Sequence, residues 1–179
     1  DGDTDLPKLL KSLTRISGLE WVRLMYAYPG RISDSLTAVL AEEENICKYL
    51  DIPVQHIDDK ILKAMNRRGS SDDIKRTIEG LRKRVPGIAL RTSLIVGFPG
   101  ETEAAFKRLL SFVKEVEFEH LGVFTYSPEE GTPAYTLSHQ VPAEAAQERL
   151  DRIMKAQAKI SLKKNRALVG ATRTVLVDG

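Results

Sequence analysis

The sequence contains a single cysteine, Cys47, in 179 residues. One thiol cannot form a disulfide within the chain or supply a multi-cysteine metal site, so both are excluded here. A cytoplasmic location is the default expectation for such a chain. No apolar run approaches the roughly 20 residues of a membrane-spanning helix. The acidic residues 1–5 do not resemble a signal peptide.

An excess of charge of one sign is also missing. The 27 Lys and Arg residues nearly balance the 25 Asp and Glu residues, which gives a formal net charge of +2. This balance predicts neither strong attraction to nucleic acid nor repulsion from it. Length and composition fit one globular domain with a substantial core. The chain lacks an initiating methionine and closes on a strand-like run at residues 175–179, so we expect both ends to be cuts in a longer protein.

Apolar residues follow two alternating periods along the chain. Runs typical of strands cover residues 21–28, 49–55, 89–98 and 121–126. Apolar residues at helical spacing lie before, between and after them, at residues 6–16, 33–40, 70–81, 106–113 and 142–160. Ser33 is the expected N-cap of its helix, Ser70 and Asp73 form an expected capping box, and Pro142 suits a first helical turn. Strands alternating with helices predict a parallel sheet, either doubly wound or in a barrel.

The distribution of polar residues within the strands favours the barrel. In residues 89–97, for example, Leu94 and Val96 share one face while Arg91 and Ser93 share the other. A sheet covered by helices on both faces would have nearly continuous apolar strands. We therefore expect helices outside and a ligand cavity on the concave side, with five polar side chains converging on it: Arg23, Asp51, Gln55, Arg91 and Ser93. The alternative is buried ion pairing, such as Arg23 with Asp51, that fixes strand register.

The carboxyl ends of the four strands are rich in glycine and proline, at residues 28–30, 53–56, 96–102 and 126–133. Ligands of parallel α/β folds bind at these ends, where glycine lets the backbone approach closely and proline fixes the turn. Residues 100–102 also open a helix, whose free amides favour an anion or a carboxylate. Glycine and proline at the carboxyl ends of all four predicted strands together predict a binding site there.

Two of these segments, IVGFPGET at residues 95–102 and YSPEEGTPA at 126–134, together resemble the radical S-adenosylmethionine (SAM) methylthiotransferases. YLDIPVQH at 49–56 and MNRRG at 65–69 are similar to the RimO type, which acts on an aspartate of a small-subunit ribosomal protein. The type that modifies tRNA adenosine usually has Gln-Ser-Gly where this chain has Gln-His-Ile, and Arg-Pro where this chain has Glu-Glu. The resemblance runs from about Leu6 to the end.

The resemblance implies an α/β fold: a partial (βα) barrel of the radical SAM type with parallel strands and outer helices in residues 1–166. Residues 167–179 would form a linker and the first strand of a truncated TRAM β-barrel. The implied cofactors of the full-length protein are SAM and two 4Fe–4S clusters. The family holds these clusters with three cysteines of an N-terminal domain and a Cys-x3-Cys-x2-Cys loop, and this chain has neither set. We therefore expect no catalytic residue and no metal ligand here, and no activity from this chain alone.

Part of a SAM cradle is also implied. The resemblance places Gln55 near the SAM ribose or methionyl part, Ile95 and Gly97 along the adenine, and Phe124, Thr125 and Tyr126 at the adenine edge. The alternation of the strand residues adds Arg91 and Ser93 to this cradle, with Arg23 and Asp51 as an interior polar network. The arginines are candidates to bind the carboxylate of SAM or of a substrate aspartate, since a guanidinium group matches a carboxylate in geometry.

Plainer interpretations compete with these assignments. Gln55 would bond only to loop backbone, Gly97 and Gly100 would be turn glycines, residues 129–130 a solvated turn, and Cys47 a small buried apolar group. His56, His120 and His139 are too dispersed for a metal site.

In the whole protein, the resemblance implies replacement of an unactivated C–H bond by C–SCH3. The implied partners are a small-subunit ribosomal protein as substrate and an electron donor such as flavodoxin or ferredoxin, with no membrane. One alternative is a tRNA-adenosine methylthiotransferase with the same chemistry. The other is a non-catalytic α/β module that binds a different small molecule in the same cavity. An upstream Cys-x3-Cys-x2-Cys motif would separate the enzyme from the module.

Overall fold

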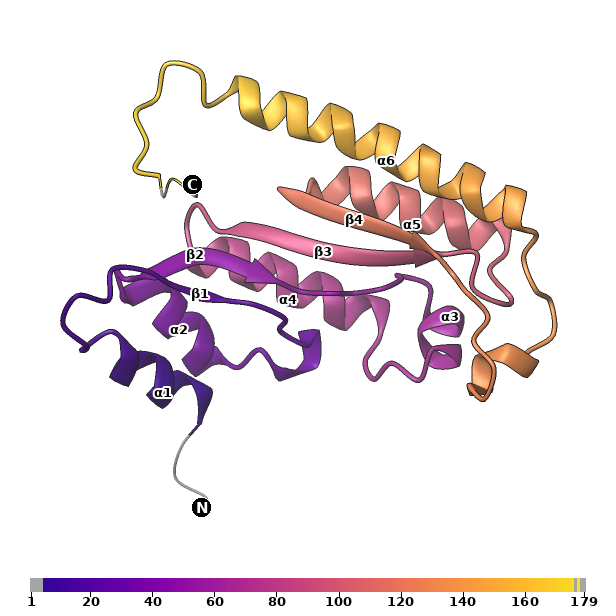
Figure 1. The fold of residues 1–179 in the computed structure, drawn as a ribbon, viewed down its shortest axis with the longest axis horizontal. Helices are drawn as coiled ribbons and strands as arrows, with labels where there is room; N and C mark the ends of the chain where they lie inside the picture. The colour runs from indigo at the N-terminus through magenta and orange to yellow at the C-terminus, as the bar shows by residue number, and fades with distance from the viewer. Residues whose placement is uncertain (1–4, 176, 178–179) are drawn as a thin grey trace.

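A computed structural model describes residues 5–175 and 177 (Figure 1). One sheet has the strand order β1-β2-β3-β4, with every neighbouring pair parallel. The strands are β1 (Val22–Leu24), β2 (Ile46–Asp51), β3 (Ala89–Val96) and β4 (His120–Thr125). Each strand pairs with the next one in the sequence, as successive units of a (βα) barrel do. The predicted fold class is confirmed.

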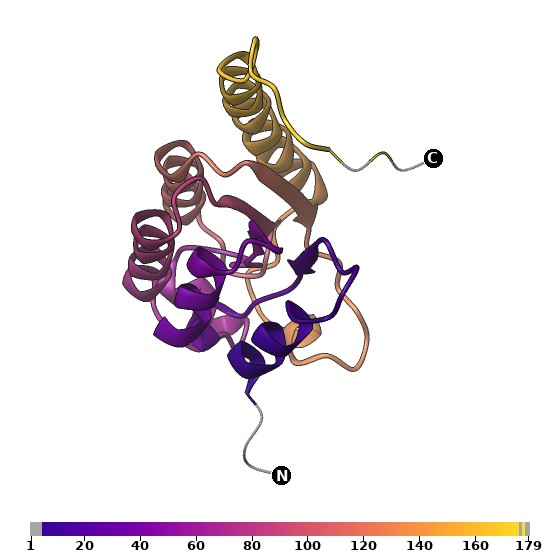
Figure 2. The same cartoon turned by 90° about the vertical axis from the view of Figure 1, so that its left-hand side faces the viewer.

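The helices follow one another around one side of this sheet (Figure 2). They are α1 (Leu6–Leu13), α2 (Asp34–Glu42), α3 (Asp59–Ala64), α4 (Ser71–Arg84), α5 (Glu103–Val116) and α6 (Ala143–Arg166), with short 3-10 turns η1 (Pro29–Arg31) and η2 (Pro133–Thr136). Helix α2 packs on β2, α6 packs on β4, and α1 packs on α2. No helix of the described residues covers the opposite side of the sheet, which we call the open face.

Strand β3 shows why the sheet has one dry face and one open face. Its residues alternate strictly, so that Leu90 and Leu94 are fully buried while Arg91 and Ser93 are partly exposed. The buried set packs in one core with apolar residues of α4 and α5, among them Ile78, Leu81, Phe106 and Leu109. The exception is the buried Thr92, whose hydroxyl donates to the Ile52 carbonyl at 2.8 Å. Its polar group is thus satisfied within the core.

The N-cap at Ser33 and the capping box of Ser70 and Asp73 are confirmed, whereas Pro142 precedes the first helical turn in which it was predicted. The Ser33 hydroxyl accepts from the amide of Leu36 at 3.1 Å, and Ser70 and Asp73 form the reciprocal capping box. Pro142 lies one residue before α6, at its N-cap. Helix α3 was not predicted, because it spans less than two turns.

Strands β1 and β2 differ from their predicted ranges, 21–28 and 49–55. The regular part of β1 ends at Leu24, and Tyr26 then adopts a left-handed backbone with φ of 60°. Strand β2 begins earlier, at Ile46, and ends at Asp51, two residues before Pro53. Proline has no amide hydrogen, so it cannot continue the ladder there.

The predicted domain boundary falls where α6 ends, at Arg166. Residues 171–175 have no regular structure. Leu176, Asp178 and Gly179, which belong to the predicted TRAM strand, lie outside the described residues, so that strand stays a prediction. Among the described residues, no helix combines the length and apolar character that a membrane crossing requires.

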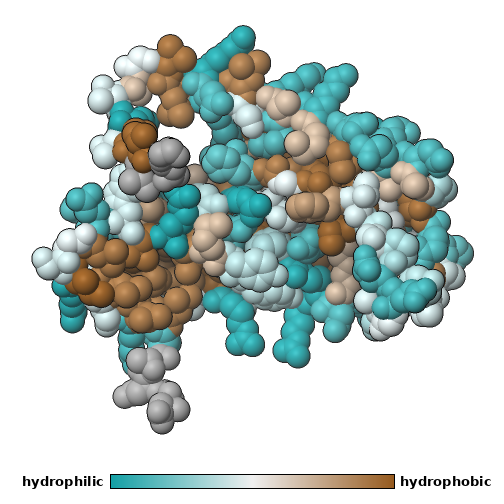
Figure 3. Space-filling view, viewed as in Figure 1, coloured by the Kyte–Doolittle hydropathy of each residue, from teal (hydrophilic) through white to brown (hydrophobic). Residues whose placement is uncertain are grey.

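Hydrophobic surface gathers over α1 and the adjoining end of the molecule, at the lower left of Figure 3. Leu6, Leu9, Ile16 and Trp21 are among the exposed apolar side chains of the segment that leads into β1. An apolar area of this kind is unusual on a fully solvated surface.

Candidate functional site

A cavity of about 560 Å³ lies on the open face, at the carboxyl ends of the strands. Its volume is within the range of small-molecule sites. Residues from β2, β3, β4 and the loops that follow them line it: Tyr26, Asp51, Pro53, Gln55, Arg91, Ser93, Ile95, Phe124, Thr125, Tyr126, Ser127, Glu129, Thr132 and Ala134. We call it the open-face cavity. It gathers eight of the ten residues predicted from the sequence and leaves out Arg23 and Gly97.

An ion pair crosses the floor of this cavity. Nη1 of Arg91 lies 2.7 Å from Oδ2 of Asp51, whose side chain is almost completely buried. The two residues are register partners on β3 and β2, so the pair also ties the strands together. Ion pairing of Asp51 that fixes strand register, the alternative interpretation of the sequence, is therefore present, but with Arg91 as the partner.

The alternative pairing of Arg23 with Asp51 is wrong. The guanidinium of Arg23 instead lies 5.0 Å from the ring centroid of Tyr49, a cation–π contact on an exposed part of β1. Burial, and after it the charge of Asp51, raise the pKa of the Tyr49 hydroxyl. Arg23 therefore belongs to the rim of the polar network and does not line the cavity.

Two buried oxygen atoms in the cavity wall lack a hydrogen-bond partner. They are Oδ1 of Asp51 and the hydroxyl of Tyr126. Burying a polar group without a partner costs about 1–3 kcal/mol, so such groups are usually satisfied by water or ligand. Both residues line the open-face cavity, although the two oxygen atoms are themselves buried from solvent.

Gln55 is held at the edge of the cavity by backbone geometry. Its φ is 67°, a left-handed value that costs energy in a residue other than glycine. Its amide donates to the Ser93 carbonyl at 2.9 Å and its carbonyl accepts from Ile95 at 2.8 Å, which fixes this bend against β3. No described residue hydrogen-bonds its side-chain amide, so the plainer interpretation, that the side chain bonds to loop backbone, has no support.

Gly97 is outside the open-face cavity and packs against α6. A Cβ at position 97 would lie 2.5 Å from the Cβ of Ala146, and the φ of Gly97 is 77°. Gly97 lines a neighbouring cavity of about 530 Å³, together with Thr125 and Tyr126. Its absent side chain therefore allows α6 to approach β3, which supplies a structural reason for glycine here.

The sequence did not reveal a buried polar network that joins the loops after β2 and β3 to α6. The carboxylate of Glu101 accepts from the Gly97 amide at 2.5 Å and from Arg149 at 2.9 Å, and lies 3.3 Å from Nε2 of His56. Nδ1 of His56 accepts from the amide of Asp58, so a neutral His56 carries its proton on Nε2 and donates it to Glu101. The start of α5 is capped by the Thr102 hydroxyl, which accepts from the amide of Ala105 at 3.2 Å, while the Glu101 carboxylate turns back to the Gly97 amide.

Asp58 extends this network to α5. Burial raises the pKa of its carboxyl, but hydrogen bonds from Arg108 and from the amide of Ile61 outweigh burial and hold the pKa below its usual value. A charged Asp58 is therefore compatible with its buried position at the start of α3.

Among the residues that the structure describes, no group of three or more His, Cys, Asp or Glu side chains is placed to hold a metal ion. Cys47 is half-buried in β2. The residues present do not fit an iron–sulfur cluster, which needs several cysteine ligands.

The chain is similar to a family model, to curated proteins and to a solved structure. The sequence model of the radical SAM superfamily matches residues 1–113. The chain is 52% identical over 178 residues to the ribosomal protein uS12 methylthiotransferase RimO of Geotalea uraniireducens, and 51% identical over 178 residues to that of Geobacter sulfurreducens. These alignments cover 99% of this chain and 40% of each relative, so the chain spans about two-fifths of their length.

The solved structure of coproporphyrinogen III oxidase (HemN) from Escherichia coli, a radical SAM enzyme, has a similar fold. Its TM-score is 0.62, at 19% identity, over 79% of this chain and 32% of the oxidase. At that identity the likeness supports the fold alone.

Proposed function

The chain belongs to the radical SAM superfamily, and we propose that it is part of the barrel of a methylthiotransferase that modifies an aspartate of a small-subunit ribosomal protein. The observation that carries this proposal is the identity of about half of the residues, over nearly the whole chain, to proteins named uS12 methylthiotransferase. The open-face cavity supplies a site for the cofactor that the superfamily implies.

The lining of the open-face cavity fits SAM chemically. Arg91 suits its carboxylate, and the polar lining residues Gln55, Ser93 and Thr125 suit its ammonium, ribose or adenine groups. Ile95 and the exposed ring of Phe124 offer apolar contact to a flat base. When bound, SAM supplies the radical chemistry and the methyl group of this enzyme class.

The chain's own contribution is to position the ligand and exclude water. Asp51 holds the guanidinium of Arg91 at a fixed place on β3, so that less side-chain entropy is lost when the arginine binds an anion. The two clusters proposed for the full-length protein require ligands from elsewhere, because this chain has one cysteine. We propose flavodoxin or ferredoxin as the electron donor and the cytoplasm as the location.

One feature favours a protein substrate over tRNA. Glu129 lines the cavity, and its carboxylate accepts from the Ser127 hydroxyl at 2.9 Å. A negative charge at the cavity mouth repels the phosphates of a nucleic acid and attracts a basic polypeptide.

The decisive experiment uses the full-length protein with its clusters reconstituted without oxygen, and offers it SAM with either ribosomal protein uS12 or tRNA. We expect mass spectrometry to show one hydrogen of an aspartate replaced by SCH3 in the protein, and no change in the tRNA. Modification of tRNA alone would support the rival methylthiotransferase. Absence of SAM cleavage with intact clusters would support the non-catalytic binding module.

A further inference from the structure

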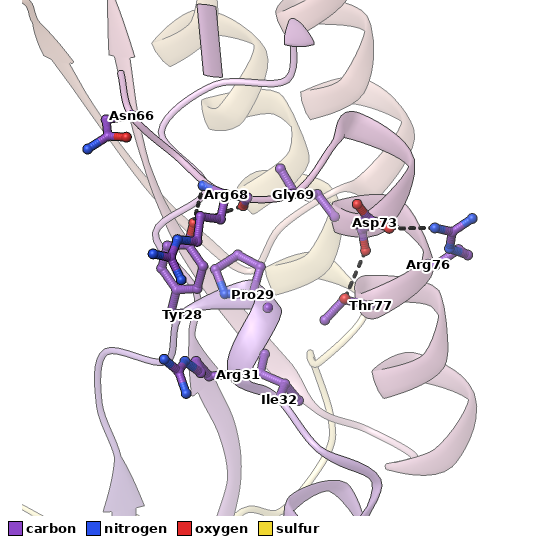
Figure 4. A pocket seen from close by; sticks show the side chains of 12 residues that line it. Tyr28, Pro29, Arg31, Ile32, Asn66, Arg68, Gly69, Asp73, Arg76 and Thr77 are labelled. Atoms are coloured by element: carbon purple, nitrogen blue, oxygen red, sulfur yellow. Dashed lines mark hydrogen bonds and ion pairs between the residues drawn. The ribbon is translucent and has the colours of Figure 1, made fainter. Parts of the chain in front are cut away.

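A second and larger cavity, of about 970 Å³, lies outside the open-face cavity and shares no lining residue with it. It lies between η1, the loop at residues 65–70 and the first turns of α4 (Figure 4). Three arginines and one acid are among the residues that line it: Tyr28, Pro29, Gly30, Arg31, Ile32, Asn66, Arg68, Gly69, Asp73, Ile74, Arg76 and Thr77. We call it the arginine cavity.

The backbone that presents Arg68 is held firmly. The hydroxyl of Tyr28 accepts from the amide of Arg68 at 2.7 Å and donates to the carbonyl of the same residue at 2.8 Å. Arg67 and Arg68 lie between two residues with left-handed backbone, Asn66 with φ of 54° and Gly69 with φ of 94°. These contacts fix the main chain of an exposed loop tip, so that its side chain starts from a defined position.

The two adjacent arginines of this loop have different roles. The guanidinium of Arg67 donates to the Pro53 carbonyl and lies 4.9 Å from the ring centroid of Tyr28, so it is committed to the fold. The side chain of Arg68 has no hydrogen bond or ion pair with any described residue. The same is true of Arg31, which comes from η1 on the same side of the cavity (Figure 4).

The acidic groups around the cavity are already engaged. Asp73 accepts from Ser70 at 2.8 Å and pairs with Arg76 at 2.5 Å, and the hydrogen bonds from Ser70 are the main cause of its lowered pKa. The carboxylate of Asp59 accepts from the amide of Ser71 at 2.6 Å. These acids are therefore used to cap α4 and to neutralise Arg76, which leaves the charges of Arg31 and Arg68 uncompensated.

We infer that the arginine cavity binds a phosphate group, carried by a nucleotide or by an RNA strand. Two guanidinium groups from separate loops can each donate two parallel hydrogen bonds to a tetrahedral phosphate, which has acceptors in several directions. A planar carboxylate is saturated by one such fork. The volume exceeds that of a phosphate alone and leaves room for the group that carries it.

Titration of the full chain with inorganic phosphate, at constant ionic strength, tests the inference. We expect Arg31→Gln and Arg68→Gln each to weaken binding about tenfold or more, as loss of a charged hydrogen bond does. Arg166→Gln, at the exposed end of α6, removes the same charge far from the cavity and should change binding less than about twofold. Unchanged circular dichroism would show that each variant is folded.

Two results of the phosphate titration would overturn the inference. One is equal weakening by all three substitutions, since this would reflect total charge. The other is citrate binding as tightly as phosphate with the same dependence on Arg31 and Arg68, since this would indicate a carboxylate site.

Adenosine diphosphate and a short oligoribonucleotide separate the two sources of phosphate. Binding that depends on both arginines for either ligand supports the inference and identifies the carrier. If neither ligand shows that dependence, the site does not serve a phosphate carrier and the inference is wrong.

Discussion

Gly97 lies directly against Ala146, so that the turn after β3 and the first turns of α6 meet without an intervening side chain. A Cβ at position 97 would come within 2.5 Å of the Cβ of Ala146, in a backbone conformation with φ of 77°. Gly100 provides a natural comparison, because its φ is 84° and a Cβ there would meet nothing within 4 Å.

Gly97→Ala should therefore destabilise the fold more than Gly100→Ala. The left-handed backbone alone costs about 1–2 kcal/mol for alanine, and the clash at position 97 adds roughly 1–3 kcal/mol. Denaturant unfolding of the two variants measures the difference. Equal losses of stability would show that α6 can move away from β3 at little cost.

Arg91→Ala should leave the protein folded and weaken its binding of SAM. Loss of the guanidinium leaves the buried carboxylate of Asp51 without its ion-pair partner, so we also expect about 1–3 kcal/mol less stability. Calorimetry with SAM on the full-length protein should show roughly tenfold weaker binding, the effect of one lost interaction with a charged group.

Arg23→Ala is the matched control for that substitution. Arg23 has the same charge and belongs to the same polar network, but it packs on Tyr49 away from the cavity. Its loss should leave SAM affinity unchanged. Full SAM affinity in Arg91→Ala would remove Arg91 from the cofactor site.

Glu119 should make stability depend on acid pH. It accepts from the Leu90 amide at 2.7 Å and from Arg82 and Lys164. Burial raises the pKa of Glu119, but these hydrogen bonds together hold it below the usual 4.5. Because the pKa of Glu119 is lower in the folded state, its carboxylate contributes fully to the free energy of unfolding well above pH 4.5. This contribution is lost as the pH falls through the folded-state pKa.

Glu119→Gln should reduce stability at pH 7 by roughly 1–3 kcal/mol and flatten this part of the acid dependence. Thermal unfolding of both proteins between about pH 3 and about pH 7, a range that brackets the usual carboxyl pKa, measures it. Parallel pH profiles would exclude Glu119 as a source of the dependence.

The isolated chain should neither assemble a 4Fe–4S cluster nor cleave SAM. A single cysteine cannot supply the ligands, and Cys47 is half-buried in β2. Absorbance after anaerobic reconstitution, compared between the chain and Cys47→Ser, measures cluster binding. A stable cluster that is lost in Cys47→Ser would contradict the argument from cysteine number.

Strand β3 shows what the sequence could predict. The alternation of Leu90, Thr92, Leu94 and Val96 with a set that contains Arg91 and Ser93 specifies which face is dry, and the structure follows it residue by residue. Period-two patterning is local information, so the side to which Arg91 and Ser93 point could be read directly.

The start of β2 was missed because its polar residue is satisfied by tertiary contacts. Lys48 lies within the strand, but its ammonium group donates to the carbonyls of Ala41 and Glu43 at 3.1 and 3.0 Å. The bend at Gln55 was also missed, since its left-handed backbone is maintained by hydrogen bonds to β3 and not by its own sequence.

The positions of Arg149 and Gln157 in the sequence indicate buried polar groups on α6. Together with Ala146, Ile153 and Ile160 they form the buried stripe of α6, at spacings of three and four residues. A charged residue inside an apolar stripe indicates a buried partner. The identity of that partner, Glu101, depends on the packing of α6 against the turn after β3, which no local pattern contains.

The attachment of α6 is graded along its length. Its first turns are tied to Glu101 by a buried pair, whereas its last turn is held by a partly exposed pair, Lys164 with Glu119, and a more exposed one, Lys163 with Glu117. Exposed pairs contribute little and are weakened by salt. Opening of the helix should therefore begin at its carboxyl end, near Arg166, and the turns around Arg149, which contact the loop after β3, should open last.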